Sequence, residues 1–211
     1  MEANLIDSGA LHKLSYGLFV LTARADGRDN GCIINTCMQM TSVPMRISIT
    51  VNKNNLTTEM IQKTGIFNVN VLTTDTPYRV FEHFGLVSGR ETNKFENCEQ
   101  ELRTENGLLY LPKFTNAVLS GKVIETLDCG SHLMFLAELV EAKVFSDAAP
   151  VTYAEYFARI KPKPQAAPAA GKIVGWRCRI CNFVYEGETL PADYACPICG
   201  HGAGDFEPIY E

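Results

Sequence analysis

The sequence of 211 residues lacks any long hydrophobic run. No apolar stretch reaches the roughly 18 residues that a membrane-spanning helix needs. The first residues, MEANLIDSGALHK, also lack the basic head and long apolar core of a signal peptide. These two absences predict a cytoplasmic protein with no membrane partner.

The chain has no excess of positive charge either. Its 19 Lys and Arg residues stand against 24 Asp and Glu, which gives a net charge of −5. Because nucleic-acid-binding proteins usually present a basic face, we expect no nucleic-acid partner. A Gly-x-Gly-x-x-Gly fingerprint after a strand is also missing, so the sequence predicts no separate dinucleotide-binding domain.

What the chain does have is a set of paired cysteines near its end. Cys178 pairs by spacing with Cys181, and Cys196 with Cys199. Two such pairs can close a tetrahedral sulfur site that suits zinc or a single iron. A segment of about 40 residues buries too little surface to fold without such help, so we expect the metal to hold it together. The other four cysteines show no paired spacing and are interpreted as reduced thiols: Cys32, Cys37, Cys98 and Cys129.

The choice between zinc and iron decides the function of this segment. A zinc ribbon would be structural, since zinc has no redox chemistry. From Lys172 to Glu211 there are three basic residues against six acidic, unlike a ribbon that binds nucleic acid. The aromatic residues around the cysteines form a predicted core: Trp176, Phe183, Tyr185, Tyr194 and Phe206. With W-x-C-x-x-C, C-P-x-C-G and a final D-F-E, the segment resembles a short rubredoxin, which implies iron.

The rest of the chain predicts a mainly β fold. Apolar or alternating runs recur between turn residues, with few candidate helices, and this pattern is typical of an antiparallel barrel. A final predicted hairpin joins residues 117–127 to residues 132–145. Short helices are predicted over 7–14, 54–63, 76–84 and 153–160, and residues 85–105 as a long polar loop. In residues 66–72, Phe67, Val69 and Val71 are expected to alternate with polar Asn68 and Asn70.

The predicted domain organisation has three parts. Residues 1–160 form the barrel, residues 161–171 a Pro- and Ala-rich linker, and residues 172–211 the metal-held domain. Ten residues of Pro-rich chain reach about 30 Å. The small domain can therefore dock on its own barrel or reach another protein.

Several runs in the barrel resemble the flavin reductase-like family, whose fold is an FMN-binding split barrel. They are NTCMQMTSVP from Asn35, VNKNNLTT from Val51, GIFNVNVL from Gly65, GRETNKF from Gly89 and CGSHLMFLAEL from Cys129. The resemblance covers nearly all of residues 8–146. It implies FMN as cofactor, NAD(P)H as a transient substrate bound over the flavin, and a homodimer.

The resemblance also implies which residues hold the flavin. The candidates for the ring edge are Asn35, Thr36, Gln39, Met40 and Thr41. The candidates for the phosphate are Asn52, Lys53, Thr57 and Thr58, with Thr57 near a predicted helix start that favours an anion. Lys94 and Phe95 resemble loop residues that approach the flavin. His132 resembles the family's histidine at the reactive face and is the candidate catalytic residue, although Ser131 stands where the family has Asp.

The two parts together resemble the high molecular weight rubredoxins. In that group NAD(P)H reduces FMN, FMN reduces iron, and iron supplies a flavodiiron protein that reduces oxygen or nitric oxide. The sequence keeps two alternatives open. One is a flavin reductase that releases reduced flavin to a monooxygenase, and the other is a non-redox binding protein with a zinc ribbon.

Overall fold

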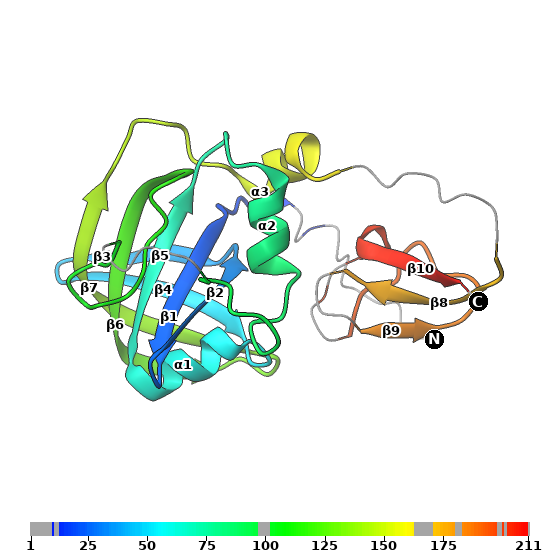
Figure 1. Ribbon diagram of the computed structural model, residues 1–211, viewed down its shortest axis with the longest axis horizontal. Helices are drawn as coiled ribbons and strands as arrows, with labels where there is room; N and C mark the ends of the chain where they lie inside the picture. The colour runs from blue at the N-terminus through cyan, green and yellow to red at the C-terminus, as the bar shows by residue number, and fades with distance from the viewer. Residues whose placement is uncertain are drawn as a thin grey trace.

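The computed structural model describes residues 10, 13–96, 102–162, 171–179, 183–197, 200 and 202–210. It contains a seven-stranded sheet and a separate three-stranded sheet (Figure 1). Most of the helix predicted over residues 7–14 lies outside the described residues. None of the described helices is long and apolar enough to cross a bilayer.

The large sheet forms the barrel. Its strands are β1 (Phe19–Ala25), β2 (Arg28–Ile34), β3 (Cys37–Ser42), β4 (Met45–Asn52), β5 (Ile66–Leu72), β6 (Thr115–Asp128) and β7 (His132–Val144). They pair antiparallel throughout, in the order β2-β1-β5-β6-β7-β4-β3, so β2 and β3 are the edges. The predicted class, mainly β with an antiparallel split barrel and few helices, is confirmed.

Helices pack against strands of the large sheet. The long helices are α1 (Leu56–Thr64) and α2 (Tyr78–Gly85), and a last turn comprises α3 (Tyr153–Glu155) and the π-helical η2 (Tyr156–Ile160). α1 ends as predicted at Gly65, which takes the left-handed conformation with φ 71°. In Figure 1, α1 lies at the bottom of the barrel, α3 at the top and α2 between their levels.

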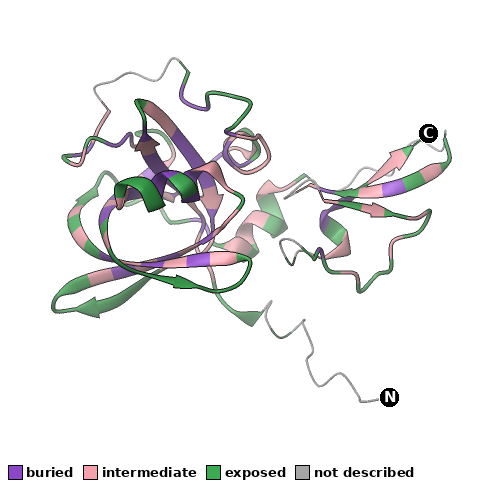
Figure 2. Ribbon diagram, turned by 90° about the horizontal axis from the view of Figure 1, so that it is seen from below, coloured by how far each residue is buried: buried purple, intermediate pink, exposed green. Residues whose placement is uncertain are grey.

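The barrel core contains large apolar side chains from facing strands. Phe67 on β5 and Phe135 on β7 are fully buried, together with Ile49 on β4. Phe67 lies opposite Gly121 of β6, where an added Cβ would come 2.5 Å from the ring. Figure 2 shows the buried residues concentrated on the strands of the barrel. Glycine at 121 therefore makes room for the largest side chain of the core.

The predicted alternation in β5 is wrong for its asparagines, because Asn68 and Asn70 are both fully buried. Asn68 donates to the hydroxyl of Thr104 at 2.7 Å, and Asn70 donates to the carbonyl of Val20 at 2.9 Å. The amide of Leu111 donates to Asn70 at 2.8 Å. Hydrogen bonding offsets the cost of burying these amides and fixes the segment 102–111 against the sheet.

The loop predicted over residues 85–105 is only partly confirmed. Gly85 still belongs to α2, and the described residues from Leu86 to Glu96 form turns and bends. Lys94 and Phe95 are buried, contrary to the expectation that the loop lies outside the core. Phe95 packs on Phe84 of α2 with ring centroids 5.3 Å apart. Residues 97–101, which include Cys98, lie outside the described residues.

The small domain is a separate sheet of β8 (Ile173–Cys178), β9 (Val184–Glu186) and β10 (Phe206–Tyr210), in the order β10-β8-β9. A short 3-10 turn, η3 (Ala203–Asp205), precedes β10. Figure 1 shows this sheet beside α2. Residues 163–170 of the predicted linker lie outside the described residues.

Candidate functional site

A cavity of about 350 Å³ opens beside β2, between the start of α1, the end of α2 and η2. One part of its lining is polar: Asn54, Asn55, Thr57, Ser88 and Arg90. Another part is aromatic: Phe81, Phe84, Tyr153, Tyr156 and Phe157. The polar part comes from the start of α1 and the segment after α2, and the aromatic part comes from α2, α3 and η2. Such a lining suits a ligand with one anionic and one ring-shaped end.

The polar part combines a helix start with a cation. Asn55 caps α1 in extended conformation, and its side chain makes no capping hydrogen bond. Arg90 pairs with Glu59, with Nη1 to Oε2 at 3.2 Å, and also donates to the carbonyl of Asn54 at 3.4 Å. The guanidinium is thereby held beside the first turn of α1, where amide dipoles favour an anion. This arrangement fits a phosphate.

Lys94 brings a second cation to the cavity wall. Its side chain is only 7% exposed, and its ammonium donates to the carbonyls of Gly31 and Phe84, both at 3.0 Å. Burial lowers the pKa of Lys94, while the nearby Cys32 raises it in part. An ammonium has three N–H donors, so two carbonyls leave one donor for a ligand.

Asn30 and Thr57 form a buried polar pair in the same wall. Asn30 donates to the Thr57 hydroxyl at 2.9 Å, while burial raises the pKa of the neighbouring Cys32 thiol and hydrogen bonding by Thr57 lowers it in part. The Thr57 hydroxyl is therefore engaged within the protein. Among the described residues, the Asn30 amide oxygen has no hydrogen-bond partner. A buried acceptor of this kind fits a ligand that carries hydroxyl or N–H donors, as a flavin does.

His132 lies at the start of β7, directly opposite Asn52 of β4. Its Nδ1 is 2.8 Å from the hydroxyl of Ser131. Burial lowers the pKa of His132, so the neutral ring is favoured at neutral pH. A neutral imidazole in the cavity wall can donate or accept a hydrogen bond without adding charge.

The structure brings only part of the predicted site together. The cavity lining includes Asn35, Thr36, Asn52, Thr57, Lys94 and His132. The predicted residues outside that lining are Gln39, Met40, Thr41, Lys53, Thr58 and Phe95.

These outlying residues have other surroundings. Gln39, Met40 and Thr41 are exposed on the edge strand β3. Lys53 pairs with Asp128 at 2.6 Å, and the Thr58 hydroxyl donates to the carbonyl of Asn52 at 2.6 Å. The flavin-binding role of all these residues stays a prediction.

Sequence reasoning missed several lining residues. Arg90 lies within the GRETNKF run that carried the family resemblance, so attention to its charge could have found it. Tyr153, Tyr156 and Phe157 are spaced i, i+3 and i+4, the spacing of one helical face. Asn30 gave no signal, because an Asn in the polar run DGRDNG indicates a turn rather than a binding site.

The described cysteines of the small domain are deeply buried. Cys178 and Cys196 are 0% and 2% exposed, and they pack with Phe206. The predicted aromatic core is confirmed, with Tyr194 against Tyr185 at 4.7 Å and against Phe206 at 5.5 Å between ring centroids. The other two predicted ligands, Cys181 and Cys199, lie outside the described residues.

Backbone turns position the two described cysteines. The amide of Cys178 donates to the carbonyl of Phe183 at 2.8 Å. The amide of Gly200 donates to the carbonyl of Cys196 at 2.8 Å, and Gly200 has a φ of 74°. This left-handed position explains the glycine after the second pair. Buried thiols in an apolar shell fit a four-cysteine metal site.

Comparison with known families identifies both parts. The model of the flavin reductase like domain matches residues 11–160. The chain belongs to the flavin reductase-like family. A second family model, the rubredoxin-like domain of rubrerythrin, matches residues 176–207 of the same chain.

Individual proteins agree with this assignment. A high molecular weight rubredoxin of Moorella thermoacetica is 37% identical over 97% of this chain and 100% of its own. A ferric-chelate reductase (NAD(P)H) of Archaeoglobus fulgidus is 36% identical over 75% of this chain and 93% of its own. The solved structure of an FMN-binding protein from Thermus thermophilus superposes with a TM-score of 0.62 at 16% identity, covering 99% of this chain and 94% of the other. The last similarity shows the fold of the flavin reductase-like barrel.

Proposed function

We propose that this protein is an electron-transfer oxidoreductase that passes electrons from NAD(P)H through FMN to a four-cysteine rubredoxin iron centre. The observation that carries the proposal is the union of a flavin reductase-like domain and a rubredoxin-like domain in one chain, similar over its full length to a high molecular weight rubredoxin. A nicotinamide gives up a hydride, and a single iron accepts one electron. A bound flavin supplies the conversion between these two chemistries.

The electron balance follows from these carriers. One NAD(P)H reduces two ferric centres to two ferrous centres and releases NAD(P)⁺ and one proton. The iron is proposed to lie in a cage of Cys178, Cys181, Cys196 and Cys199. We propose a flavodiiron protein as the acceptor, on the resemblance to the high molecular weight rubredoxins.

The size of the cavity is compatible with a small ligand such as FMN. Its volume of about 350 Å³ lies near the lower end of small-molecule sites. Arg90 and the start of α1 are proposed to bind the phosphate, and Asn30 and Lys94 to orient the flavin by hydrogen bonds. The aromatic part is proposed to exclude water from the ring end. His132 is proposed to hold the nicotinamide in place as a neutral hydrogen-bonding group.

A second candidate function is the release of reduced flavin to another protein. It is favoured by the similarity to the reductase component of a FADH(2)-dependent resorcinol hydroxylase of Rhizobium, 31% identical over 64% of this chain and 74% of its own. A releasing enzyme binds its flavin weakly. Stoichiometric FMN that stays bound through gel filtration would therefore contradict this alternative.

Anaerobic titration with NADH and NADPH, followed by absorbance, tests the main proposal. The ferric-thiolate bands should bleach together with the flavin bands. A Cys178→Ser variant, which lacks iron, should still reduce its flavin at a near-normal rate, because that step takes place in the barrel. It should supply electrons poorly to a flavodiiron partner. Full delivery by the iron-free variant would contradict the proposed relay.

We also propose that two copies form a homodimer through the β3–β4 hairpin. Strand β3 is a sheet edge, and the hairpin exposes Met38, Met40, Val43 and Met45. Val43 is 92% exposed. Contiguous apolar surface on an unpaired edge strand indicates an interface. A second copy placed there would also bring Gln39 and Thr41 into a subunit contact.

A further inference from the structure

A buried ion pair joins the barrel to the small domain. Lys161 follows η2 at the end of the barrel, and its ammonium pairs with the carboxylate of Asp205 in η3. The two side chains are only 9% and 10% exposed. Removing charges from water costs free energy unless they meet in a defined geometry. The pair therefore marks a specific contact rather than a chance encounter of surface charges.

This ion pair belongs to a continuous series of contacts between the cavity and the metal site. The Lys161 ammonium lies 4.5 Å from the ring centroid of Phe157, which lines the cavity. Within the small domain, the carbonyl of Asp205 accepts a hydrogen bond from the backbone amide of Arg179 at 2.8 Å. Arg179 follows Cys178, the first predicted metal ligand, directly in the chain. Few contacts thus separate the wall of the cavity from the cysteine site.

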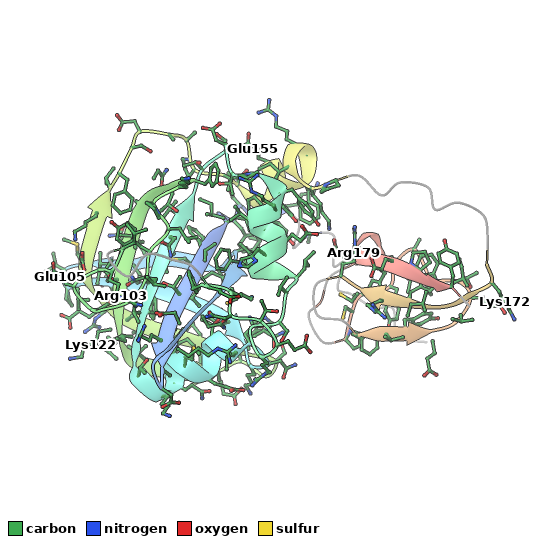
Figure 3. The ribbon with its side chains drawn as sticks, in the orientation of Figure 1. Arg103, Glu105, Lys122, Glu155, Lys172 and Arg179 are labelled. Atoms are coloured by element: carbon green, nitrogen blue, oxygen red, sulfur yellow. The ribbon has the colours of Figure 1, made fainter. Side chains whose placement is uncertain are left out.

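A second group of side chains supports the same face. Burial raises the pKa of the Tyr78 and Tyr156 phenols, and the charge of Arg179 lowers both in part, so its guanidinium lies within electrostatic range of the two rings. The charge of Glu207 on β10 also raises the pKa of Tyr78. Figure 3 shows Arg179 on the side of the small domain that faces α2.

The far side of the small domain offers a contrast. Lys172 pairs with Glu188 at 2.7 Å, but their side chains are 68% and 65% exposed. Figure 3 shows Lys172 at the end of the small domain that points away from the barrel. An exposed pair contributes little to stability. It provides a matched control for the buried pair.

We propose that the small domain docks on its own barrel through this face, with Lys161 and Asp205 as positioning residues. The docked position links Arg179, the neighbour of Cys178, to Phe157 of the aromatic part through Asp205 and Lys161. Docking within one chain is favoured because Lys161 directly follows η2 and pairs with Asp205 of the same chain, so the contact forms without a second copy. The role of this contact in electron delivery rests on the proposed function, whereas the docking itself does not.

Three variants test the docking: Lys161→Gln, Asp205→Asn, and the double charge swap Lys161→Asp with Asp205→Lys, with Lys172→Gln as control. The full chain of each is loaded with iron and flavin, and intact ferric and flavin bands establish that both domains remain folded. Hydrogen exchange of α2 and small-angle scattering then report docking. We expect faster exchange in residues 78–85 and a larger radius of gyration for the two single variants. The charge swap should restore part of the contact.

The kinetic arm measures flavin and iron bleaching separately by stopped flow. With Lys161→Gln, flavin reduction should be unchanged, and iron reduction should slow about tenfold or more, since losing one partner of a buried charge pair weakens the contact at least that much. If hydrogen exchange, scattering and iron reduction in the Lys161→Gln and Asp205→Asn variants match those of Lys172→Gln, the docking proposal is wrong. A mixed dimer of one Lys161→Gln subunit and one Asp205→Asn subunit separates the two arrangements, because docking within one chain then leaves no intact pair, whereas docking between copies leaves one. Iron reduction that stays fast for about half of the centres in this mixed dimer would replace docking within one chain by docking between copies. A wild-type protein whose iron is never reduced would refute the proposed function instead, and the exchange data would still decide the docking.

Discussion

The side chain of Asn30 on β2 donates a 2.9 Å hydrogen bond to the hydroxyl of Thr57 in the first turn of α1. Both residues are buried, at 3% and 0% exposure. The bond ties the sheet to the helix at the polar part of the cavity. Because Thr57 also acts on Cys32, its hydroxyl positions the helix start rather than remaining available to a phosphate. The cation that faces the helix start is Arg90, not Lys53.

Arg90→Gln should weaken FMN binding about tenfold or more, because a charge-assisted hydrogen bond is worth about 1.5 to 3 kcal/mol. Flavin affinity can be measured by fluorescence quenching on reconstituted protein. Lys53→Gln is the control, since Lys53 lies outside the cavity lining and pairs with Asp128. A large loss with Lys53→Gln and none with Arg90→Gln would place the phosphate where the sequence alone predicted it.

Cys196→Ser should remove the iron and unfold the last 40 or so residues, because metal binding and folding form one equilibrium in so small a domain. Cys196 is 2% exposed within the aromatic core of that domain. Metal analysis and fluorescence of the single tryptophan, Trp176, report the two effects. Cys129→Ser, at an exposed thiol in the barrel, should change neither. Purified wild-type protein that carries zinc, after growth with ample iron, would contradict the iron assignment.

His132 should make the protein less stable in acid. Its folded-state pKa is lowered by burial, so the unfolded chain binds its proton first as the pH falls below about 6.5. The contribution of His132 is therefore fully present above that pH and is lost through the window below it. We expect a smaller difference in urea midpoint between about pH 7.5 and pH 5 for His132→Asn than for wild type. His83→Asn is the second comparison and should keep the wild-type difference. If His132→Asn shows the same midpoint difference between the two pH values as wild type, His132 does not act as a buried neutral group.

The double substitution Met38→Glu with Met45→Glu should give a monomer, since it puts charge on the proposed interface. The two side chains are 66% and 60% exposed in one copy, so the fold should tolerate the change. Sedimentation velocity measures the outcome. Val174→Glu, at a 42% exposed position of the small domain, is the control. A dimer that survives the double substitution would show that another surface holds the copies together.

Local signals in the sequence predicted most of the fold. Gly65 ended α1 as expected, and the aromatic residues near the cysteines form the predicted core around Cys178. Burial of Asn68 and Asn70 was not predictable, because their partners come from segments far along the chain. Local polarity indicates exposure, and only tertiary hydrogen bonds reverse that expectation.

The candidate site was predicted less completely than the fold. The cavity lining includes Asn35 and Lys94 among the residues that the family resemblance implies, but not Lys53, whose side chain pairs with Asp128. Adjacent residues in a turn point in different directions, and sequence does not reveal which one faces the cavity. The aromatic part depends on η2, which folds back from the end of the barrel and shares no neighbouring sequence with β2. Domain boundaries and the cytoplasmic location remain predictions.

The close approach of Gly121 to Phe67 limits how the barrel can evolve. An ordinary Cβ never comes within 2.5 Å of another heavy atom, so even alanine at 121 requires the ring to move, and the ring is enclosed by its neighbours. A substitution at one of the two positions is thus acceptable only after a smaller residue has appeared at the other. In homologues of this chain, a smaller residue at position 67 of β5 should accompany a larger residue at position 121 of β6. The summed volume of the two side chains should stay nearly constant.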